Sequence, residues 1–481
     1  MSILANYKPQ EVLKHFGAIS QIPRGSGNEK AVSDYIATFA TELGCEVMQD
    51  KQHNLIIFKA GNGTGQSKEP IILQAHLDMV CEKNTDTVHD FLNDPIKLYV
   101  DGDYIKARGT TLGADNGLGV AMTMALLEAT DIPHPPLEIV LTVEEETGMD
   151  GAENLDFSQL NSKKMVNLDN SNDTCFIMGC AAGTTVEYTL ATEWETVAAD
   201  TVAFAINVGG LTGGHSGGDI NKERGNALRI TGQILAALSG QMDVRIASIN
   251  GGMKVNAIPR EAVAIIAIPK KDADKARAIL EECQANLAIQ YRVTDSGLVI
   301  SWETDSIGKV LTSDIGHSVI ASLNLFPNGV IARSMEIERL VNASCNLGVV
   351  ETCHEAVKIS AMPRGAARFY NQATEAQISN LAALTGAQVT FMQRSPAWPY
   401  NPDSELLKVA LKCYKPVFGQ DAKVTAIHAG LECGIFMEQI PGLDIISFGP
   451  TNHDLHTPDE RLSISSTEKS WEFLKALLAE V

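Results

Sequence analysis

Apolar positions in the first 170 residues switch between helical spacing and short strand-like runs. In 28–43, Val32, Ile36 and Ala40 recur every four residues, the spacing of an amphipathic helix. Apolar runs such as PIILQAHLDMV and LEIVLTV are typical of strands that are buried on both faces. Further helices are expected at 8–20 and 117–129, further strands at 45–50, 54–60 and 165–169, and a hairpin around Asp101-Gly102. This order predicts an α/β fold, with helices layered on a largely parallel, mixed sheet.

The pattern changes near residue 186, where strand-like runs alternate apolar and polar positions. Strands are expected at 186–194, 201–208, 262–268, 342–351 and 356–363, with helices at 219–240, 271–288, 309–323 and 374–386. Such a pattern is typical of an α+β layer whose sheet has one solvated face. The segments GGMKVNAIPREAVAIIAIP and RLVNASCNLGVVETCHEAVKISAMP resemble each other, so we expect this region to be internally duplicated.

The α/β pattern returns after the proline-rich segment 395–404, which is interpreted as a linker. Helices at 405–416 and 467–480 flank strands at 423–429 and 443–450. The sequence therefore predicts one domain built from 1–185 and 397–481, with an α+β lid domain, 186–396, inserted into it.

Composition and charge narrow the class of protein. The chain has 481 residues with 38 Lys plus Arg and 59 Asp plus Glu, a formal net charge of −21. A surface with this much negative charge repels phosphate backbones and anionic lipids. We therefore expect neither nucleic acid nor a membrane as a partner. The nine cysteines are scattered without a CxxC pair, and the first 20 residues have no basic region followed by an apolar run, so no signal peptide is expected. Both features favour reduced thiols and a cytoplasmic location.

Acidic and imidazole side chains cluster just after the apolar strand runs. They are His76 and Asp78, Asp115, the triplet Glu144–Glu146, Asp169 and His456. In doubly wound sheets, the carboxyl ends of the strands meet at a binding crevice, so these groups are expected to lie together. Mixed His, Asp and Glu ligands suit zinc, manganese or cobalt, and five or more candidates suggest two ions that share a carboxylate.

A competing motif is Gly214-His215-Ser216-Gly217-Gly218, which fits the GxSxG pattern of serine hydrolases. That pattern requires a strand that runs directly into the serine, whereas here the strand is expected to end near residue 208. A plain glycine loop and a loop that presents His215 to a substrate oxyanion are the two other interpretations.

Taken together, the motifs LQAHLDMV, GTTLGADNG, TVEEETGMDGA, VNLD, GGHSGG and HTPDE resemble the co-catalytic di-zinc metallopeptidases. That family includes aminoacylases, glutamate carboxypeptidases and peptidase T. Within it, NDTVHDF, NAIPREA, NLGVVET and IHAGLECG are most similar to the bacterial cytosolic aminoacyl-histidine dipeptidases, which are carnosinase-like. The resemblance extends from about residue 8 to the C-terminus.

The resemblance implies a role for each candidate side chain. Asp115 would bridge two divalent metal ions, with Zn²⁺ expected first and Mn²⁺ or Co²⁺ as alternatives. His76 and Asp169 would complete one metal site, and Glu146 and His456 the other; His453, three residues away, is a competing ligand. Glu145 would be the general base and Asp78 would orient His76. The residues expected to bind substrate are His215, Asn256, Arg364 and Glu432, with Arg364 on the C-terminal carboxylate and Glu432 on the free amine.

The resemblance implies hydrolysis of dipeptides with a free N-terminus, among them Xaa-His and β-Ala-His, by a water that lies between the metals. An N-acyl amino-acid deacylase and an aminotripeptidase are the alternatives with the same fold, and a serine hydrolase that uses Ser216 is a third. The expected partners are dipeptide substrates and, because relatives often dimerise, a second copy of the chain.

Overall fold

The computed structural model describes residues 3–481, which fold into two compact units. The first comprises the chain up to Gly179 together with Tyr400–Ala426 and Leu431–Val481. The second comprises Cys180–Pro399 and Ile427–Gly430. Both ends of the chain thus build one unit. The predicted inserted segment, 186–396, lies inside the second unit, and the short return segment 427–430 did not stand out in the sequence.

An eight-stranded mixed sheet forms the centre of the first unit. Its order is β1 (Glu46–Gln49), β2 (Leu55–Lys59), β6 (Leu137–Thr142), β3 (Ile71–His76), β7 (Lys164–Asn167), β23 (Asp444–Ser447), β8 (Cys175–Cys180) and β22 (Lys423–Ile427). The central strands β6, β3, β7 and β23 are parallel, whereas β1, β2 and β8 pair antiparallel with their neighbours. The carboxyl ends of the parallel strands therefore meet at one edge, as the prediction requires.

The helices of this unit bury the sheet. They are α1 (Gln10–Ile19), α2 (Lys30–Glu42), α3 (Ala114–Glu128), α4 (Asp150–Glu153), α9 (Glu405–Phe418), α10 (Cys433–Gln439) and α11 (Ile464–Glu480). Every residue of β3 and β6 is buried, as expected for strands that are covered on both faces. The predicted hairpin is present as β4 (Leu98–Asp101) and β5 (Tyr104–Ala107), and it continues through β25 (Arg461–Ser463) to β24 (Asn452–His453).

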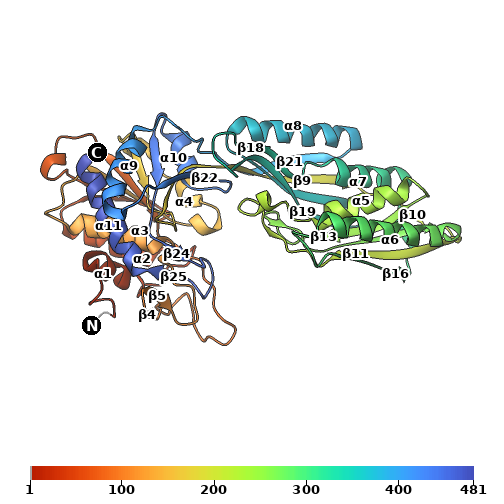
Figure 1. The fold of residues 1–481 in the computed structure, drawn as a ribbon, viewed down its shortest axis with the longest axis horizontal. Helices are drawn as coiled ribbons and strands as arrows, with labels where there is room; N and C mark the ends of the chain where they lie inside the picture. Colours follow the sequence, from red (N-terminus) through yellow and green to blue (C-terminus); the bar gives the residue numbers. More distant parts are fainter. Residues whose placement is uncertain (1–2) are drawn as a thin grey trace. The chain divides into compact units, whose positions relative to one another are not determined.

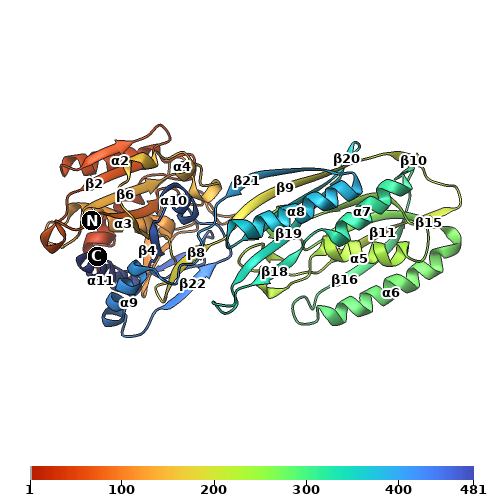
Figure 2. The ribbon, with the colours of Figure 1, turned by 90° about the horizontal axis from the view of Figure 1, so that it is seen from above.

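The second unit is a long antiparallel sheet with helices α5–α8 on one face (Figures 1 and 2). The strand order is β16 (Val299–Asp305), β11 (Thr201–Gly209), β15 (Ala262–Pro269), β13 (Arg245–Gly251), β19 (Val341–Thr352), β20 (Ala356–Gly365), β9 (Ala182–Ala191) and β21 (Gln388–Ser395). The helices are α5 (Ala227–Ser239), α6 (Ala273–Gln290), α7 (Ser313–Leu325) and α8 (Arg368–Thr385). Strand β18 (Gly329–Arg333) pairs with β19 off this path.

The topology of this sheet supports the predicted internal duplication. One half runs β11, α5, β13, β15, α6, β16, and the other runs β9, α7, β19, β20, α8, β21. The two halves have opposite strand orders and join where β13 pairs antiparallel with β19, at Gly251 and Val350. A two-fold rotation of one βαββαβ half gives this arrangement.

Some predicted helix boundaries are wrong. The helix expected at 219–240 begins only at Ala227, because the Asn226 side chain accepts hydrogen bonds from the amides of Leu228 and Arg229 and caps the first turn. Residues 309–311 of the helix expected at 309–323 form instead the strand β17 (Lys309–Leu311), which pairs with β10 (Trp194–Thr196). Among residues 3–481, no helix has the length and apolarity that a membrane crossing requires.

Candidate functional site

His76 is the last residue of β3, and Asp78 follows it in the loop beyond. Both side chains are buried, at 1% and 0% exposure. Asp78 Oδ1 lies 3.2 Å from His76 Nδ1, and Asp78 Oδ2 accepts a hydrogen bond of 2.7 Å from Ser26 Oγ. The carboxylate of Asp78 therefore faces Nδ1 of the imidazole, and Nε2 is free to interact with groups on the opposite side of the ring.

Asp115 lies at the start of α3, and contacts with residues far away in the sequence fix the backbone of the turn that precedes it. Gly113 has a φ of 68°, and a Cβ on it would lie 2.6 Å from Met79 Sδ, so only glycine fits. The buried Glu460 carboxylate accepts hydrogen bonds from the amides of Leu112 (2.7 Å), Gly113 (2.9 Å) and Ala114 (3.0 Å). These contacts fix the backbone from which the Asp115 carboxylate projects.

The two oxygens of Asp115 face two different histidines. Asp115 Oδ1 lies 3.1 Å from His76 Nε2, and Asp115 Oδ2 lies 3.2 Å from His456 Nε2. His76 Nε2 is also 3.5 Å from Asp169 Oδ1, while His456 Nε2 is 3.1 Å from Glu146 Oε1. The five predicted ligands thus lie together as two groups that share Asp115.

His453 and His456 were the two candidates for one ligand position, and of these two only His456 lies beside the carboxylates of Asp115 and Glu146. His453 belongs to β24, and its ring contacts Tyr104 edge-on at 6.0 Å between centroids.

The electrostatics of this cluster are those of crowded acidic groups. Burial and the neighbouring Asp115 raise the pKa of Asp169 to about 7. Hydrogen bonds to Asp115 and Glu146 raise the pKa of His456 to about 10. Burial alone would lower the pKa of His76, yet the nearby carboxylates, with Asp169 foremost, raise it well above its usual value. The cluster therefore attracts positive charge strongly.

The donor set fits divalent cations. Ligand atoms of His76, Asp115 and Glu146 all lie within 4.8 Å of one another. Glu146 Oε1 is buried and lies 3.1 Å from His456 Nε2, so this oxygen and this imidazole nitrogen are close enough to bind one cation between them. Imidazole and carboxylate ligands in this number suit zinc and similar transition metals better than magnesium or calcium.

Glu145 lies in the 3₁₀ turn η2 (Glu145–Thr147), between this cluster and the end of β6. Its amide donates to Asp78 Oδ1 and the amide of Glu146 donates to Asp78 Oδ2, each at 3.1 Å. Asp78 thus holds both the imidazole of His76 and the turn that carries the two glutamates. Burial, together with Asp169, Glu432 and Glu146, raises the pKa of Glu145 well above its usual value.

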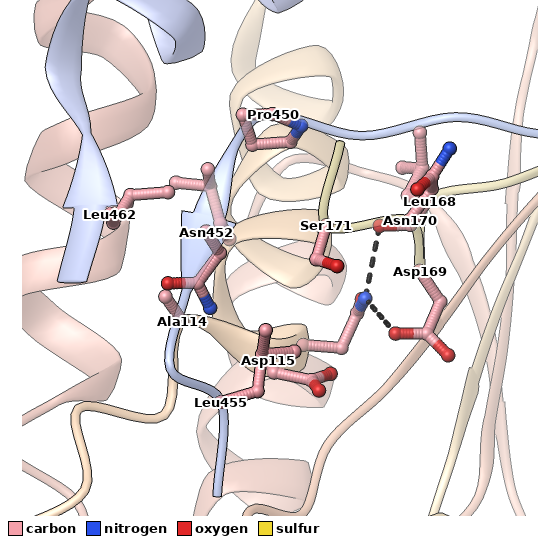
Figure 3. A pocket seen from close by; sticks show the side chains of 13 residues that line it. Ala114, Asp115, Leu168, Asp169, Asn170, Ser171, Pro450, Asn452, Leu455 and Leu462 are labelled. Carbon is pink, nitrogen blue, oxygen red and sulfur yellow. Dashed lines mark hydrogen bonds between the residues drawn. The ribbon is translucent and has the colours of Figure 1, made fainter. Parts of the chain in front are cut away.

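A small cavity of about 50 Å³ lies next to this cluster, and Figure 3 shows the side chains around it. Asp115, Asp169, Leu455 and Leu462 are among the residues that line it. The Asn116 amide donates to Asp169 Oδ1 at 2.7 Å and to the carbonyl of Leu168 at 2.9 Å. A volume of this size can hold water beside both carboxylates.

Glu432 is buried at 2% exposure behind β3 and β6. Its Oε2 accepts hydrogen bonds from Gln74 Nε2 at 2.5 Å and from Thr142 Oγ1 at 2.8 Å. Oε1 is buried and accepts no hydrogen bond. Burial raises the pKa of this carboxyl to about 8, so charging it requires a cationic partner.

The remaining predicted residues lie in the second unit, where they come together around Ser216. The Ser216 amide donates to the carbonyl of Asn256 at 2.8 Å, and Arg364 Nε lies 3.4 Å from Ser216 Oγ. His215 Nδ1 accepts hydrogen bonds from the amides of Gly217 (3.3 Å) and Gly218 (3.0 Å). Nδ1 is therefore the acceptor nitrogen, and the neutral ring carries its proton on Nε2.

Arg364 is buried at 7% exposure, and among the described residues 3–481 its side chain contacts Ser216 Oγ and Met362 Sδ rather than a carboxylate. Burial lowers its pKa to about 10. A buried guanidinium without a counterion is costly, which is the condition expected of an anion-binding group. The neighbouring His428 is also buried, and its Nε2 is 2.7 Å from Ser344 Oγ.

Ser216 lacks the surroundings of a serine-hydrolase nucleophile. The strand before it, β12 (Gly214–His215), has two residues, and the short 3₁₀ turn η4 (Ile220–Lys222) follows in place of a helix. Ser216 Oγ contacts Arg364 Nε and Met362 Sδ, neither of which can act as a base.

Sequence reasoning missed several residues that shape the site. Arg24, Ser26 and Glu29 lie in a glycine-rich segment that had no assigned role, and Glu460 is the last residue of the motif HTPDE, in which only His456 was singled out. His428 lies within the motif IHAGLECG, where only Glu432 was singled out. Each acts through contacts with residues far away in the sequence, which spacing cannot reveal.

Comparisons with known proteins agree on one family. The model of the peptidase family M20/M25/M40 matches residues 72–480. The cytosol non-specific dipeptidase of Escherichia coli (strain K12) is 36% identical over 482 residues, covering 100% of this chain and 99% of the relative. The crystal structure of aminoacylhistidine dipeptidase from Vibrio alginolyticus is also 36% identical, with a TM-score of 0.92 over 99% of this chain and 98% of that one. An aminopeptidase from Bacillus cereus shares the fold, with a TM-score of 0.57 and 15% identity over 98% and 99% of the two chains.

Proposed function

Because the chain belongs to peptidase family M20/M25/M40, we propose that it is a metal-dependent dipeptidase. The observation that carries this proposal is the position of Asp115. Its two carboxylate oxygens face His76 and His456 at 3.1 and 3.2 Å, and each histidine is paired with a further carboxylate. Two cation sites that share one carboxylate account for this arrangement, whereas a single site leaves two of the five ligands unexplained.

The ligands are assigned accordingly. His76 and Asp169 would hold one ion, Glu146 and His456 the other, and Asp115 both. We propose zinc at both sites, with manganese and cobalt as alternatives, because the donors are imidazole nitrogens and carboxylate oxygens. When bound, such ions lower the pKa of water and polarise a carbonyl group.

Glu145 is proposed as the general base. Its carboxylate takes a proton from the attacking water and later delivers it to the amine nitrogen of the leaving amino acid. The raised pKa supports this role, because a base whose pKa is nearer to neutrality also serves as the acid in the second step. Asp78 orients the His76 imidazole from behind and fixes the turn that holds Glu145.

Substrate contacts are proposed for four further residues. His215 Nε2–H donates to the carbonyl oxygen as negative charge develops there, and the accepting role of Nδ1 supports this assignment. The unpaired guanidinium of Arg364 binds the C-terminal carboxylate. Asn256, whose carbonyl already holds the amide of Ser216, contacts substrate with its exposed side chain. Glu432 binds the free amine through its buried, unpartnered Oε1.

The proposed substrates are dipeptides with a free N-terminus, including Xaa-His and β-Ala-His. Two full-length relatives support this class, since one is named a non-specific dipeptidase and the other an aminoacylhistidine dipeptidase. The Escherichia coli relative is named a cytosol enzyme, so we propose the cytoplasm for this chain as well. A homodimer stays a prediction that light scattering of the purified protein would test.

A panel of matched substrates tests this proposal against its alternatives. Rates are measured on Ala-Ala, β-Ala-His, N-acetyl-Ala and Ala-Ala-Ala, together with the Ser216→Ala variant. The proposal expects turnover of the two dipeptides to exceed that of the other two by tenfold or more. Faster hydrolysis of N-acetyl-Ala would indicate a deacylase, and faster hydrolysis of the tripeptide an aminotripeptidase. If Ser216→Ala abolished activity while both metals stayed bound, Ser216 chemistry would replace the metal-dependent mechanism.

A further inference from the structure

Four consecutive backbone amides at the end of β6 are all held by side chains from elsewhere in the first unit. The amide of Val143 donates to Asn54 Oδ1 at 3.0 Å. That of Glu144 donates to Glu29 Oε1 at 3.1 Å. The next two, Glu145 and Glu146, donate to the Asp78 carboxylate as described above. Asn54 and Glu29 have no part in the proposed chemistry, and of these two acceptors Glu29 is the one that binds the amide of the residue directly before Glu145.

The amide that Glu29 binds belongs to the residue with the least favourable backbone. Glu144 has φ 54° and ψ 30°, the left-handed region that residues other than glycine adopt only at a cost. Such a conformation persists where the surrounding structure holds it. Because Glu144 directly precedes Glu145, its dihedral angles set the direction in which the Glu145 side chain leaves the turn.

Glu29 is itself firmly placed. It is 4% exposed and immediately precedes α2. Its Oε1 also accepts a hydrogen bond of 3.0 Å from the amide of Gly27. Three residues before that glycine, the buried Arg24 donates to the carbonyls of Leu77 (2.8 Å) and Asp78 (3.0 Å). Together with Ser26, which binds Asp78 Oδ2, the segment 24–29 contacts both loops that carry reacting groups.

We propose that Glu29 is a positioning residue for the hydrolytic reaction: by accepting the amide of Glu144, it holds the turn that aims the Glu145 carboxylate at the reacting atoms. The inference rests on the proposed role of Glu145 as general base. Displacement of a catalytic group by about 1 Å typically reduces the rate by about a hundredfold, so loss of this single contact has a measurable effect on turnover.

The same strand offers a matched control. Glu138 lies near the other end of β6, is 3% exposed, and accepts hydrogen bonds from the amides of Asn161 (3.0 Å) and Ser162 (3.1 Å). It is therefore a second buried glutamate with the same kind of partners, but it holds a loop away from the reacting groups. Truncating either glutamate leaves backbone amides unpaired and lowers stability, whereas only Glu29 is expected to affect turnover.

The experiment compares Glu29→Ala, Glu29→Gln, Glu138→Ala and Glu145→Ala in the full-length, metal-loaded protein, with Ala-Ala as substrate. Metal content and thermal unfolding are measured for each variant. We expect Glu29→Ala to keep both metals and a KM within about twofold of the unmodified protein, while kcat falls ten- to a hundredfold. Glu29→Gln, whose amide oxygen can accept the same hydrogen bond, is expected to recover kcat to within about threefold.

Each other outcome has a definite meaning. Unchanged kcat in Glu29→Ala, or an equal loss in Glu138→Ala, would overturn the positioning role. Loss of metal from Glu29→Ala, with no recovery in Glu29→Gln, would make the residue a structural support only and would also overturn it. Full activity in Glu145→Ala would instead refute the proposed base itself, which distinguishes failure of the function from failure of this inference.

Discussion

Asp115 is the residue through which the two groups of predicted ligands are connected. Because each of its oxygens faces a different histidine, removing its carboxylate should affect both cation sites at once. We expect Asp115→Ala to bind neither metal at a concentration that saturates the unmodified protein, and to lose activity. Metal analysis after dialysis measures this directly. Retention of one ion per chain would mean that the sites are independent, and retention of two would refute the bridging role.

His428 provides a pH-dependent test of the second unit. Burial lowers its pKa to about 3, so it stays neutral in the folded protein, whereas in the unfolded chain it binds a proton below pH 6.5. The unfolded state therefore gains protons first as the pH falls, and stability is lost progressively from about pH 6.5 towards pH 3.

At pH 5 this loss amounts to about 2 kcal/mol. A His428→Asn variant cannot titrate, so the stability difference between the unmodified protein and this variant should shift by that amount between pH 8 and pH 5 in urea unfolding. A difference that is constant with pH would show that His428 is not buried as a neutral ring.

At the scale of single residues, candidate site residues could be predicted where a titratable side chain ends or directly follows a strand. His76, Asp169 and Glu146 could be predicted to lie together because each ends or follows an apolar run, and parallel strands end at a common edge. Glu29 and Glu460 could not be found, because their partners lie 115 residues away for Glu29 and up to 348 residues away for Glu460. Only the folded chain brings these carboxylates to the amides that they hold.

At the scale of elements, the turn before α3 depends on one buried carboxylate. Glu460 accepts hydrogen bonds from the backbone amides of Leu112, Gly113 and Ala114, and also from the side-chain amide of Asn452 at 2.9 Å. We expect Glu460→Ala to lower the free energy of unfolding by about 1–3 kcal/mol and to weaken metal binding, since the amides left behind are unpaired and the Asp115 turn loosens.

Thermal unfolding and titration with a zinc chelator check both effects. Glu460→Gln retains one acceptor oxygen, so its stability and its metal affinity should lie between those of the unmodified protein and Glu460→Ala. Unchanged metal affinity in Glu460→Ala would show that the turn keeps its shape without this support.

The helices and strands themselves were predicted best where the periodicity is long and uninterrupted. The expected helices at 28–43 and 405–416 correspond closely to α2 and α9. The region 219–226 was wrongly included in a helix because its polar and glycine-rich residues do not by themselves show where Asn226 caps the first turn. Strand β17 was mistaken for helix because its pairing with β10 is a contact over more than a hundred residues.

At the scale of the whole molecule, the domain organisation was predicted from the order in which the α/β and α+β patterns occur along the chain. The α/β pattern at both ends implied one unit made from distant segments, and the structure has such a unit. The duplication was visible only as a weak likeness between two segments, whereas the strand order of the sheet makes it plain. The segment Ile427–Gly430 was not predictable, because four residues are too few to show a change of pattern.

The measurement that tests the central proposal most directly is hydrolysis of Ala-Ala and β-Ala-His by the purified protein before chelation, after chelation, and after zinc or manganese is added back. We predict that both activities fall to background when the metals are removed and recover when either suitable ion is restored, with two ions bound per chain at full activity. Dipeptide hydrolysis that persists in the metal-free protein would contradict the account, as would absence of activity in a protein that holds both ions.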